Sequence, residues 1–418
     1  MPPRYTLALD IGKNNHVACV YDTATGQLSQ PLNVPVTAEG FARLKAMLQR
    51  YSKSPADFLV GYEATGHYAE TMVRDLRTEG YQLVRLNPAA VAAFRRGLGR
   101  RAKSDVFDSE ALARQLAIGN YRADPAPSPT QQVLQRLTHL RVDLVKEQTQ
   151  WVNRLRGLLD RLCPELPKIL GDMTSPTTLA VLSAYPGRQR LAQAAAAELT
   201  QVVRQVSRGQ RGSDYVAKLQ AAARQSVGVN DRWLDTEVKL VVNQLTSVVS
   251  GLRDLDKEIA QVTNEYLAEL SNALGFAKPL TIKDFPWGSY VAVGSLLAEI
   301  GDVRRYPSLK HLLSYLGWCP YQRQSGEYEM AHPPMSHQGN RHARRMVWLM
   351  AIGAIGSVPE YQAYFARRVA EGKSKMKTLV AVGRKLLSVL YAILRTGVPY
   401  DPQRYLQFGE AKNKNPKN

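Results

Sequence analysis

The chain has 418 residues, too many for one ordinary hydrophobic core, so its length predicts two or three domains. It carries 55 Lys and Arg against 36 Asp and Glu, a formal net charge of +19, which favours a nucleic-acid partner over a merely basic housekeeping protein. Cys19, Cys163 and Cys319 lie far apart and argue against a disulfide framework or a zinc site. No apolar leader or membrane-length run is evident, so we expect no membrane partner and a cytoplasmic location.

Residues 1–125 are predicted to form an α/β domain. The runs YTLALDIG and HVACVYD are typical of short strands, and the turn residues of DTATGQ favour antiparallel pairing of the first strands. A helical stretch with Phe41, Leu44, Met47 and Leu48 on one face follows, then strand DFLVGYEAT, helix HYAETMVRDLRTEG and strand YQLVRLN. Three strands, helix, strand, helix, strand is the order of the RNase H-like fold.

Residues 126–275 are predicted to be a helical coiled-coil region with a variable insert. Pro125, Pro127 and Pro129 mark a linker before it. Two apolar runs then follow heptad spacing, which indicates long helices that pair within a bundle of one chain or between chains. The first run is Leu137, Leu140, Leu144, Trp151, Leu155, Leu158 and Leu162, and the second is Val238, Val241, Leu245, Val248, Leu252, Leu255, Ile259, Val262 and Tyr266.

The insert, residues 170–232, is Ala- and Gln-rich and helical by propensity, with a Gly-containing patch SRGQRGSD. Residues 276–405 are predicted to form a mainly α-helical C-terminal domain of shorter helices rich in Gly, Tyr and Arg. The polar run GEAKNKNPKN belongs to a tail, residues 406–418, that is expected to be disordered.

Four carboxylates stand where the predicted N-terminal fold would bring them together. Asp10 closes the first strand and Glu63 the fourth, and these strands are neighbours in an RNase H-like sheet. Asp105 and Asp108 lie three residues apart at the start of a helix with Ser104 as candidate N-cap, so they share one helical face. Like charges so crowded need a cation, and hard oxygen ligands suit Mg²⁺, of which two ions can clamp the oxygens of a phosphodiester.

Two other interpretations of these residues stay open. Taken singly, Asp10 and Glu63 are ordinary residues at strand ends, and Asp105 and Asp108 are acids favoured by a helix dipole. The DIG run also occurs in sugar kinases and actin-like ATPases, but those need a second phosphate loop where residues 130–270 offer helices.

The chain resembles the insertion sequence 110 family of transposases. The resemblance lies in DIG, GYEATGHY, LNP and KSDVFDSEALA, and then in LLAEIGDVRRYPSLKHLLSYLGWCP, RQSG, GNRHARR, KSKMKTLVAVGRKLL and GVPYDP. It implies a RuvC-like DEDD domain that binds Mg²⁺ or Mn²⁺ and a C-terminal serine transposase domain. It also implies donor and target DNA and a structured bridge RNA as partners, and a prokaryotic, nucleoid-associated location. Piv-type DNA invertases share both domains, and a non-catalytic nucleic-acid scaffold is the alternative from another class.

The family match gives one serine a role that the residues alone do not. Ser325 precedes Gly326 in YQRQSGEYEM, and sequence alone would make it a turn residue. The family's Ser-Gly motif implies that Ser325 is the nucleophile that attacks a DNA phosphate; Ser336 is a competitor that the motif disfavours. One departure concerns a Pro-Gly-x-Gly turn usual in the family, which here reads PWGS over residues 286–289, so that a DNA-contact role of this turn is in doubt.

Two basic clusters are candidates for phosphate contact; the first could equally face RNA, and the alternative for the second is a solvated helix face. The first lies beside the acidic pair, and the second is a helical face with i, i+3, i+4 spacing. Their members are Arg95, Arg96, Arg100, Arg101 and Lys103, and Arg341, Arg344 and Arg345. We expect the long heptad runs to mediate self-association, as dimers that pair into a tetramer when two DNA duplexes are joined.

Overall fold

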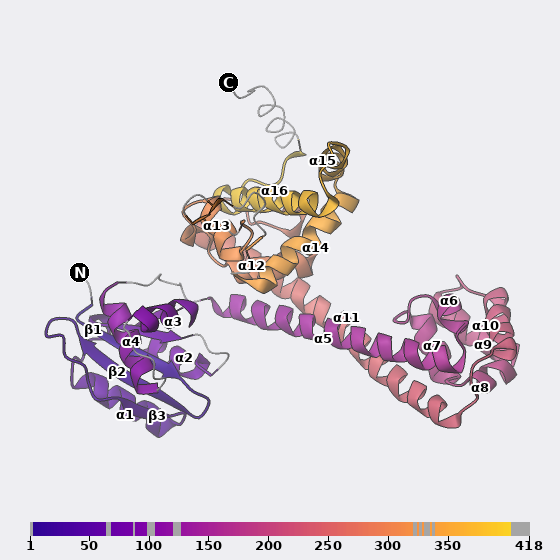
Figure 1. Ribbon diagram of the computed structural model, residues 1–418, viewed down its shortest axis with the longest axis horizontal. Coiled ribbons are helices and arrows are strands. Elements are labelled where there is room, and N and C mark those ends of the chain that lie inside the picture. Colours follow the sequence, from indigo (N-terminus) through magenta and orange to yellow (C-terminus); the bar gives the residue numbers. More distant parts are fainter. Residues whose placement is uncertain are drawn as a thin grey trace. The chain divides into compact units, whose positions relative to one another are not determined.

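The computed structural model describes residues 3–63, 68–86, 88–97, 105–119, 127–320, 324–325, 328–329, 335–336 and 339–402. Of residues 88–90, 105–108, 324–325 and 328–329 it describes the backbone alone. The chain divides into two units, Met1–Ala126 and Pro127–Asn418 (Figure 1). Among the described residues, no helix is both long and apolar enough to cross a membrane.

The first unit is built on a five-stranded sheet in the order β3-β2-β1-β4-β5. Strand β1 pairs antiparallel with β2 and parallel with β4, and β4 pairs parallel with β5. The predicted element order and the adjacency of the first and fourth strands are confirmed, and the mixed sheet is compatible with an RNase H-like domain. The strands are β1 (Tyr5–Ile11), β2 (Asn15–Asp22), β3 (Leu32–Pro35), β4 (Phe58–Glu63) and β5 (Gln82–Leu86).

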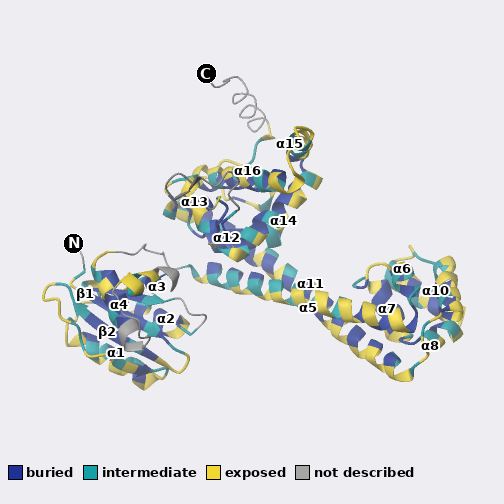
Figure 2. Ribbon diagram, in the orientation of Figure 1, coloured by how far each residue is buried: buried dark blue, intermediate teal, exposed yellow. Residues whose placement is uncertain are grey.

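Helices cover both faces of this sheet because its strands alternate apolar residues between two cores. Leu7 and Leu9 pack on one face with buried residues of α1 (Ala38–Gln49) and α2 (Glu70–Thr78). Ala8 packs on the other face with α3 (Pro88–Gly97) and α4 (Asp105–Ala117). Figure 2 shows the strands largely buried between these layers.

Helix α4 lies close against the sheet for a local reason. Gly61 on β4 faces Leu116 of α4, and a Cβ at Gly61 would collide with the Leu116 side chain. On β1, the Thr6 hydroxyl donates a buried hydrogen bond of 3.0 Å to the Ala113 carbonyl of the same helix. These two contacts fix the height of α4 over the β1–β4 pair.

The second unit is organised by two long antiparallel helices, α5 (Pro129–Leu162) and α11 (Arg232–Leu274), which lie side by side (Figure 1). The C-terminal end of α5 and the N-terminal end of α11 contribute to one hydrophobic core. The N-terminal end of α5 and the C-terminal end of α11 contribute to another. Beside the core at the N-terminal end of α5, Arg141 Nε lies 2.5 Å from Asp256 Oδ1 and ties the two long helices together. The two predicted heptad runs therefore pair with each other inside one chain.

The first of these cores includes the predicted insert, residues 170–232, which is helical. Its helices are short and pack on the α5–α11 pair with their apolar faces inward. The patch SRGQRGSD forms the turn between two of them, with Arg208 at φ 53 and Gly209 at φ 80. These helices are α6 (Leu166–Leu170), α7 (Pro176–Ala184), α8 (Arg188–Gln193), α9 (Ala196–Ser207) and α10 (Ser213–Gln225).

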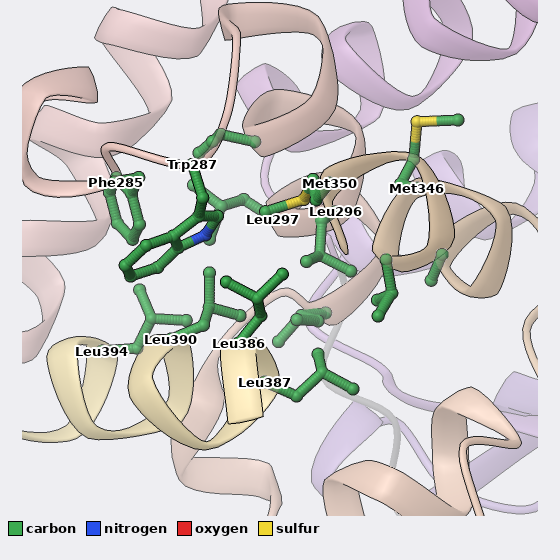
Figure 3. Close-up of a cluster of buried hydrophobic side chains, with 14 of the residues drawn as sticks. Phe285, Trp287, Leu296, Leu297, Met346, Met350, Leu386, Leu387, Leu390 and Leu394 are labelled. Atoms are coloured by element: carbon green, nitrogen blue, oxygen red, sulfur yellow. The ribbon is translucent and has the colours of Figure 1, made fainter. Parts of the chain in front are cut away.

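The other core belongs to the C-terminal part of the chain. Trp287, which stands in the unusual PWGS turn, is only 4% exposed and packs among leucines of α16 (Figure 3). The turn is thus anchored by a large apolar side chain, and Ser289 caps the helix that follows it. The helices of this part are α12 (Tyr290–Ile300), α13 (Leu309–Leu316), α14 (Arg341–Ser357), α15 (Pro359–Ala370) and α16 (Lys375–Thr396).

Candidate active site

Two of the predicted carboxylates stand at one edge of the sheet. In the parallel β1–β4 pair, Leu9 is level with Tyr62, so the register carries Asp10 and Glu63, the next residues, to neighbouring positions. Alternation along the strands puts Asp10 on the face of Ala8 and Glu63 on the face of Gly61, which is the face covered by α4. Both side chains are partly exposed.

The other two carboxylates belong to α4, which begins at Asp105. The side chains of Asp105 and Asp108 lie outside the described residues, so their meeting with Asp10 and Glu63 remains a prediction. Within the described part of the chain, which lacks those two side chains, no group of three or more His, Cys, Asp and Glu suited to a metal ion occurs. The pair on the strands nevertheless offers hard oxygen ligands of the kind that Mg²⁺ and Mn²⁺ prefer.

Ser325 belongs to a small hairpin in the second unit. Strand β6 (Gln324–Ser325) pairs antiparallel with β7 (Tyr328–Glu329), and Ser325 is opposite Tyr328. Its side chain lies outside the described residues. The competitor Ser336 is buried, at 8% exposure, and its backbone N–H donates to the Cys319 carbonyl at 2.8 Å. Burial makes Ser336 the poorer candidate for attack on DNA.

The two ends of the segment that carries Ser325 are held together. Pro320 and Met335 form an antiparallel bridge, next to the hydrogen bond between Ser336 and Cys319. The segment then returns to α14 through Gly339, whose φ is 112 and whose position admits no Cβ, because one would lie 2.5 Å from the Gly317 nitrogen. Ser325 thus belongs to a loop whose two ends are held together by backbone contacts.

The predicted basic residues are only partly described. Arg95 and Arg96 lie in the last turn of α3, whereas Arg100, Arg101 and Lys103 fall outside the described residues. Arg341, Arg344 and Arg345 stand at the start of α14, as predicted, with Arg341 and Arg345 exposed and Arg344 half-buried. In sequence, the acids between residues 339 and 402 are Glu360, Glu371 and Asp401, so α14–α16 form a strongly basic block.

A buried polar cluster at the start of α14 escaped the sequence analysis. The Glu299 side chain on α12 is 8% exposed, and its carboxylate accepts from Asn340 Nδ2 and lies 2.6 Å from His139 Nε2 on α5. The His139 ring stacks on His342, with 4.0 Å between centroids. An acid in the apolar run SLLAEIG was the available signal, but its partners are distant in sequence.

Electrostatics in this cluster favour an ionised Glu299 carboxylate and a neutral His342 imidazole. Burial opposes ionisation of Glu299, but the hydrogen bonds from His139 and Asn340 outweigh it and hold its pKa below the usual value. Burial, followed by the charge of His139, lowers the pKa of His342. The cluster therefore keeps a buried negative charge that is paired within the chain.

Two family models match the parts of the chain that contain these candidate residues. Residues 7–164 match the DEDD-type IS110 transposase model, which spans the strands carrying Asp10 and Glu63 and the start of α4. Residues 287–366 match the transposase model of the IS116/IS110/IS902 family, which spans the Ser325 hairpin and the start of α14. The two models together match more than half of the chain.

Individual relatives extend the likeness. An uncharacterized protein of insertion element IS110 from Streptomyces coelicolor is 30% identical over 266 residues, 62% of each chain. One of insertion element IS116 from Streptomyces clavuligerus is 24% identical over 403 residues, 94% of this chain and 95% of the relative. A pilin gene-inverting protein from Moraxella lacunata is 23% identical over 396 residues, 94% of this chain and 97% of the relative. The chain belongs to the IS110/IS116 family of transposases.

Proposed function

We propose that this transposase is an RNA-guided DNA recombinase that cleaves and exchanges strands between a mobile element and its target. Ser325 is the nucleophile in this proposal, and divalent metal is held by four carboxylates, Asp10, Glu63, Asp105 and Asp108. The observation that carries it is the level placement of Asp10 and Glu63 on the face of the sheet that α4 covers.

The position of α4 supports the proposal that Asp105 and Asp108 belong to the same metal site as Asp10 and Glu63. Leu112 and Leu116 are buried toward the sheet, and positions 105 and 108 precede Leu112 by seven and four residues. In an α-helix, residues at these spacings lie along one face. Such a helix would carry its two N-terminal carboxylates to the edge where Asp10 and Glu63 end their strands.

The chemistry assigned to Ser325 is a transesterification. Its hydroxyl oxygen bonds to a DNA phosphorus and loses its proton, and the bond from phosphorus to the leaving-strand oxygen breaks to give a free hydroxyl. The phosphoserine ester conserves the bond for rejoining when the hydroxyl of another strand attacks it. Bound divalent metal would supply stabilisation of the charge that develops on the phosphate oxygens.

The partners in this proposal follow from charge and from the family. The basic block of α14–α16 and the arginines at the start of α14 favour phosphate contacts with DNA. Guidance by a structured bridge RNA rests on the family resemblance. The carboxylates and Ser325 stand in different units of the chain, so assembly as dimers and a tetramer could also supply them from different subunits.

A site-specific DNA invertase is the second candidate. The pilin gene-inverting relative aligns over 97% of its own length, so both transposition and site-specific inversion are compatible with this arrangement of the chain. The DNA that flanks the gene distinguishes them, since element ends with a structured non-coding stretch favour transposition.

The proposed metal site is tested by removing carboxylates one at a time. Asp10→Asn and Asp105→Asn should each abolish strand cleavage in Mg²⁺ and leave nucleic-acid affinity largely unchanged, because each removes a metal ligand and no phosphate contact. The assay uses duplexes carrying the element end and the target, with the flanking transcript. Glu39→Gln, at an exposed carboxylate in the first turn of α1, is the matched control and should cleave normally. Undiminished cleavage by both Asn variants refutes the metal site.

A further inference from the structure

We propose that Glu299 is a positioning residue for strand cleavage, which it serves by fixing the base of the segment that carries Ser325. The inference rests on the proposed role of Ser325. Glu299 is the one charged residue of α12, and its side chain is 8% exposed. An isolated buried carboxylate is costly, so its retention here calls for partners that use the charge.

The first set of partners forms a closed ring of hydrogen bonds. The Glu299 carboxylate accepts from Asn340 Nδ2. The Asn340 backbone N–H donates to the Tyr315 carbonyl at 3.1 Å. The Tyr315 hydroxyl donates to the Glu299 carbonyl at 3.1 Å and closes the ring. Because these residues belong to α12, α13 and the approach to α14, the ring fixes three elements relative to one another.

Asn340 transmits this constraint to the helix that follows the Ser325 segment. Its Oδ1 atom accepts from the backbone N–H groups of His342 and Ala343, each at 3.0 Å, and so caps α14. One amide group therefore serves two elements, with its nitrogen on Glu299 and its oxygen on α14. Next to it, Gly339 fits against the backbone of Tyr315 and Gly317. The exit of the segment is thereby fixed, a few residues from the bridge between positions 320 and 335.

The second carboxylate oxygen connects this ring to the long helix α5. His139 Nε2 lies 2.6 Å from Glu299 Oε1, and its ring stacks on His342 of α14 with an interplanar angle of 19°. A neighbouring contact is independent of the carboxylate: Gln135 Nε2 donates to the Ala298 carbonyl at 2.8 Å. Without the Glu299 carboxylate, α5 and α12 would thus remain in contact through Gln135. The connection from these two helices to Asn340 would be lost.

This arrangement separates positioning from DNA binding. An anionic buried side chain gives no phosphate contact, so loss of Glu299 should not weaken affinity. A shift of about 1 Å in a nucleophile can cost roughly 10²-fold in rate. We therefore expect Glu299→Gln to slow the single-turnover cleavage rate about 10²-fold, since its amide presents one acceptor where two donors converge.

The exchange of donor and acceptor gives the sharpest test. Asn340→Asp alone should be strongly defective, because it sets two carboxylates against each other. In the double variant Glu299→Gln/Asn340→Asp, the new amide at position 299 donates to the new carboxylate at position 340 and its oxygen accepts from His139. An aspartate caps a helix as well as an asparagine does, so the cap of α14 is kept. We expect the cleavage rate of the double variant to return to within about tenfold of wild type, against the roughly 10²-fold loss in each single variant. Gln135→Met is the matched control and should cleave at the wild-type rate.

The assay measures single-turnover cleavage of the element-end duplex with the flanking transcript and Mg²⁺, and DNA affinity by fluorescence anisotropy, in the full chain. A wild-type rate for Glu299→Gln overturns the inference, and so does a folded double variant as slow as the singles. If Glu299→Gln does not fold, Tyr315→Phe, which opens the ring without a charge change, takes its place and should slow cleavage several-fold; a wild-type rate then overturns the inference. Failure of the proposed function is distinct: wild type would not cleave, or Ser325→Ala would cleave normally.

Discussion

At the scale of single residues, a buried histidine makes the stability of the first unit depend on pH. His16 on β2 is fully buried, and among the described residues neither ring nitrogen has a hydrogen bond of good geometry; a contact with the backbone at Gly12 only partly offsets the effect of burial. Burial lowers the pKa of this imidazole below its ordinary value of 6.5. The folded state therefore holds the neutral form, while the unfolded chain binds a proton as pH falls below about 6.5.

The consequence is a loss of stability of the first unit in acid. From pH 8 to pH 5.5, the free energy of opening of the β1 and β2 amides should fall in the wild type, because protonation favours the unfolded chain below about pH 6.5. His16→Leu should weaken that dependence and stabilise the unit at pH 8 by on the order of 1 kcal/mol. Hydrogen exchange, corrected for intrinsic rates, measures both effects. Parallel pH dependences in the two proteins contradict the account.

Gly61 provides a second residue-scale prediction. Gly61→Ala should lower the stability of the first unit by roughly 1–3 kcal/mol, because the new methyl group enters the space of Leu116. It should also slow strand cleavage, since α4 carries Asp105 and Asp108. The double variant Gly61→Ala/Leu116→Ala should lose less stability than the sum of the two single losses, because Leu116→Ala vacates the space that the new methyl group enters. If urea denaturation shows the single variant as stable as wild type, the close approach of α4 is wrong.

At the scale of elements, periodicity in the sequence predicted which segments form and which faces they bury. Leu44 and Leu48 of α1 are fully buried, as the helical spacing indicated, and the alternation in β1 gave its two faces. Periodicity could not choose the partner of a long helix. Nor could it find the Glu299 cluster, because His139 and Glu299 are 160 residues apart in sequence and only the packing of α5 against α12 brings them together.

The two heptad runs show how the structure changes a prediction. The heptad spacing predicts that Leu252 and Leu255 lie in a seam that joins chains, whereas both are at most 8% exposed within a single chain. Leu255→Glu should therefore destabilise the second unit by several kcal/mol, because it buries a charge at the seam between α5 and α11. Thermal unfolding measures the effect. An unchanged midpoint with a halved mass in light scattering would instead show that the seam joins different chains.

At the scale of the whole molecule, the central question is whether one chain completes its own active site. Asp108 and Ser325 belong to different units, and α5, whose 34 residues extend about 50 Å as a helix, follows the first unit directly. We expect the carboxylates of one subunit to act with the serine of another. A mixture of Ser325→Ala and Glu63→Gln chains should then regain recombination that neither has alone. No recovery from folded, co-assembling chains would place both halves in one chain.

The most direct test of the account is the mass of the protein after it meets DNA. Wild-type chain incubated with the element-end duplex, the flanking transcript and Mg²⁺, then quenched and digested, should yield a peptide with a nucleotide esterified to Ser325. Ser325→Ala should yield no such adduct and no cleaved strand. Cleaved DNA with a free phosphate end, no adduct, and an undiminished rate in Ser325→Ala would contradict the account and assign the attack to water at the carboxylate site.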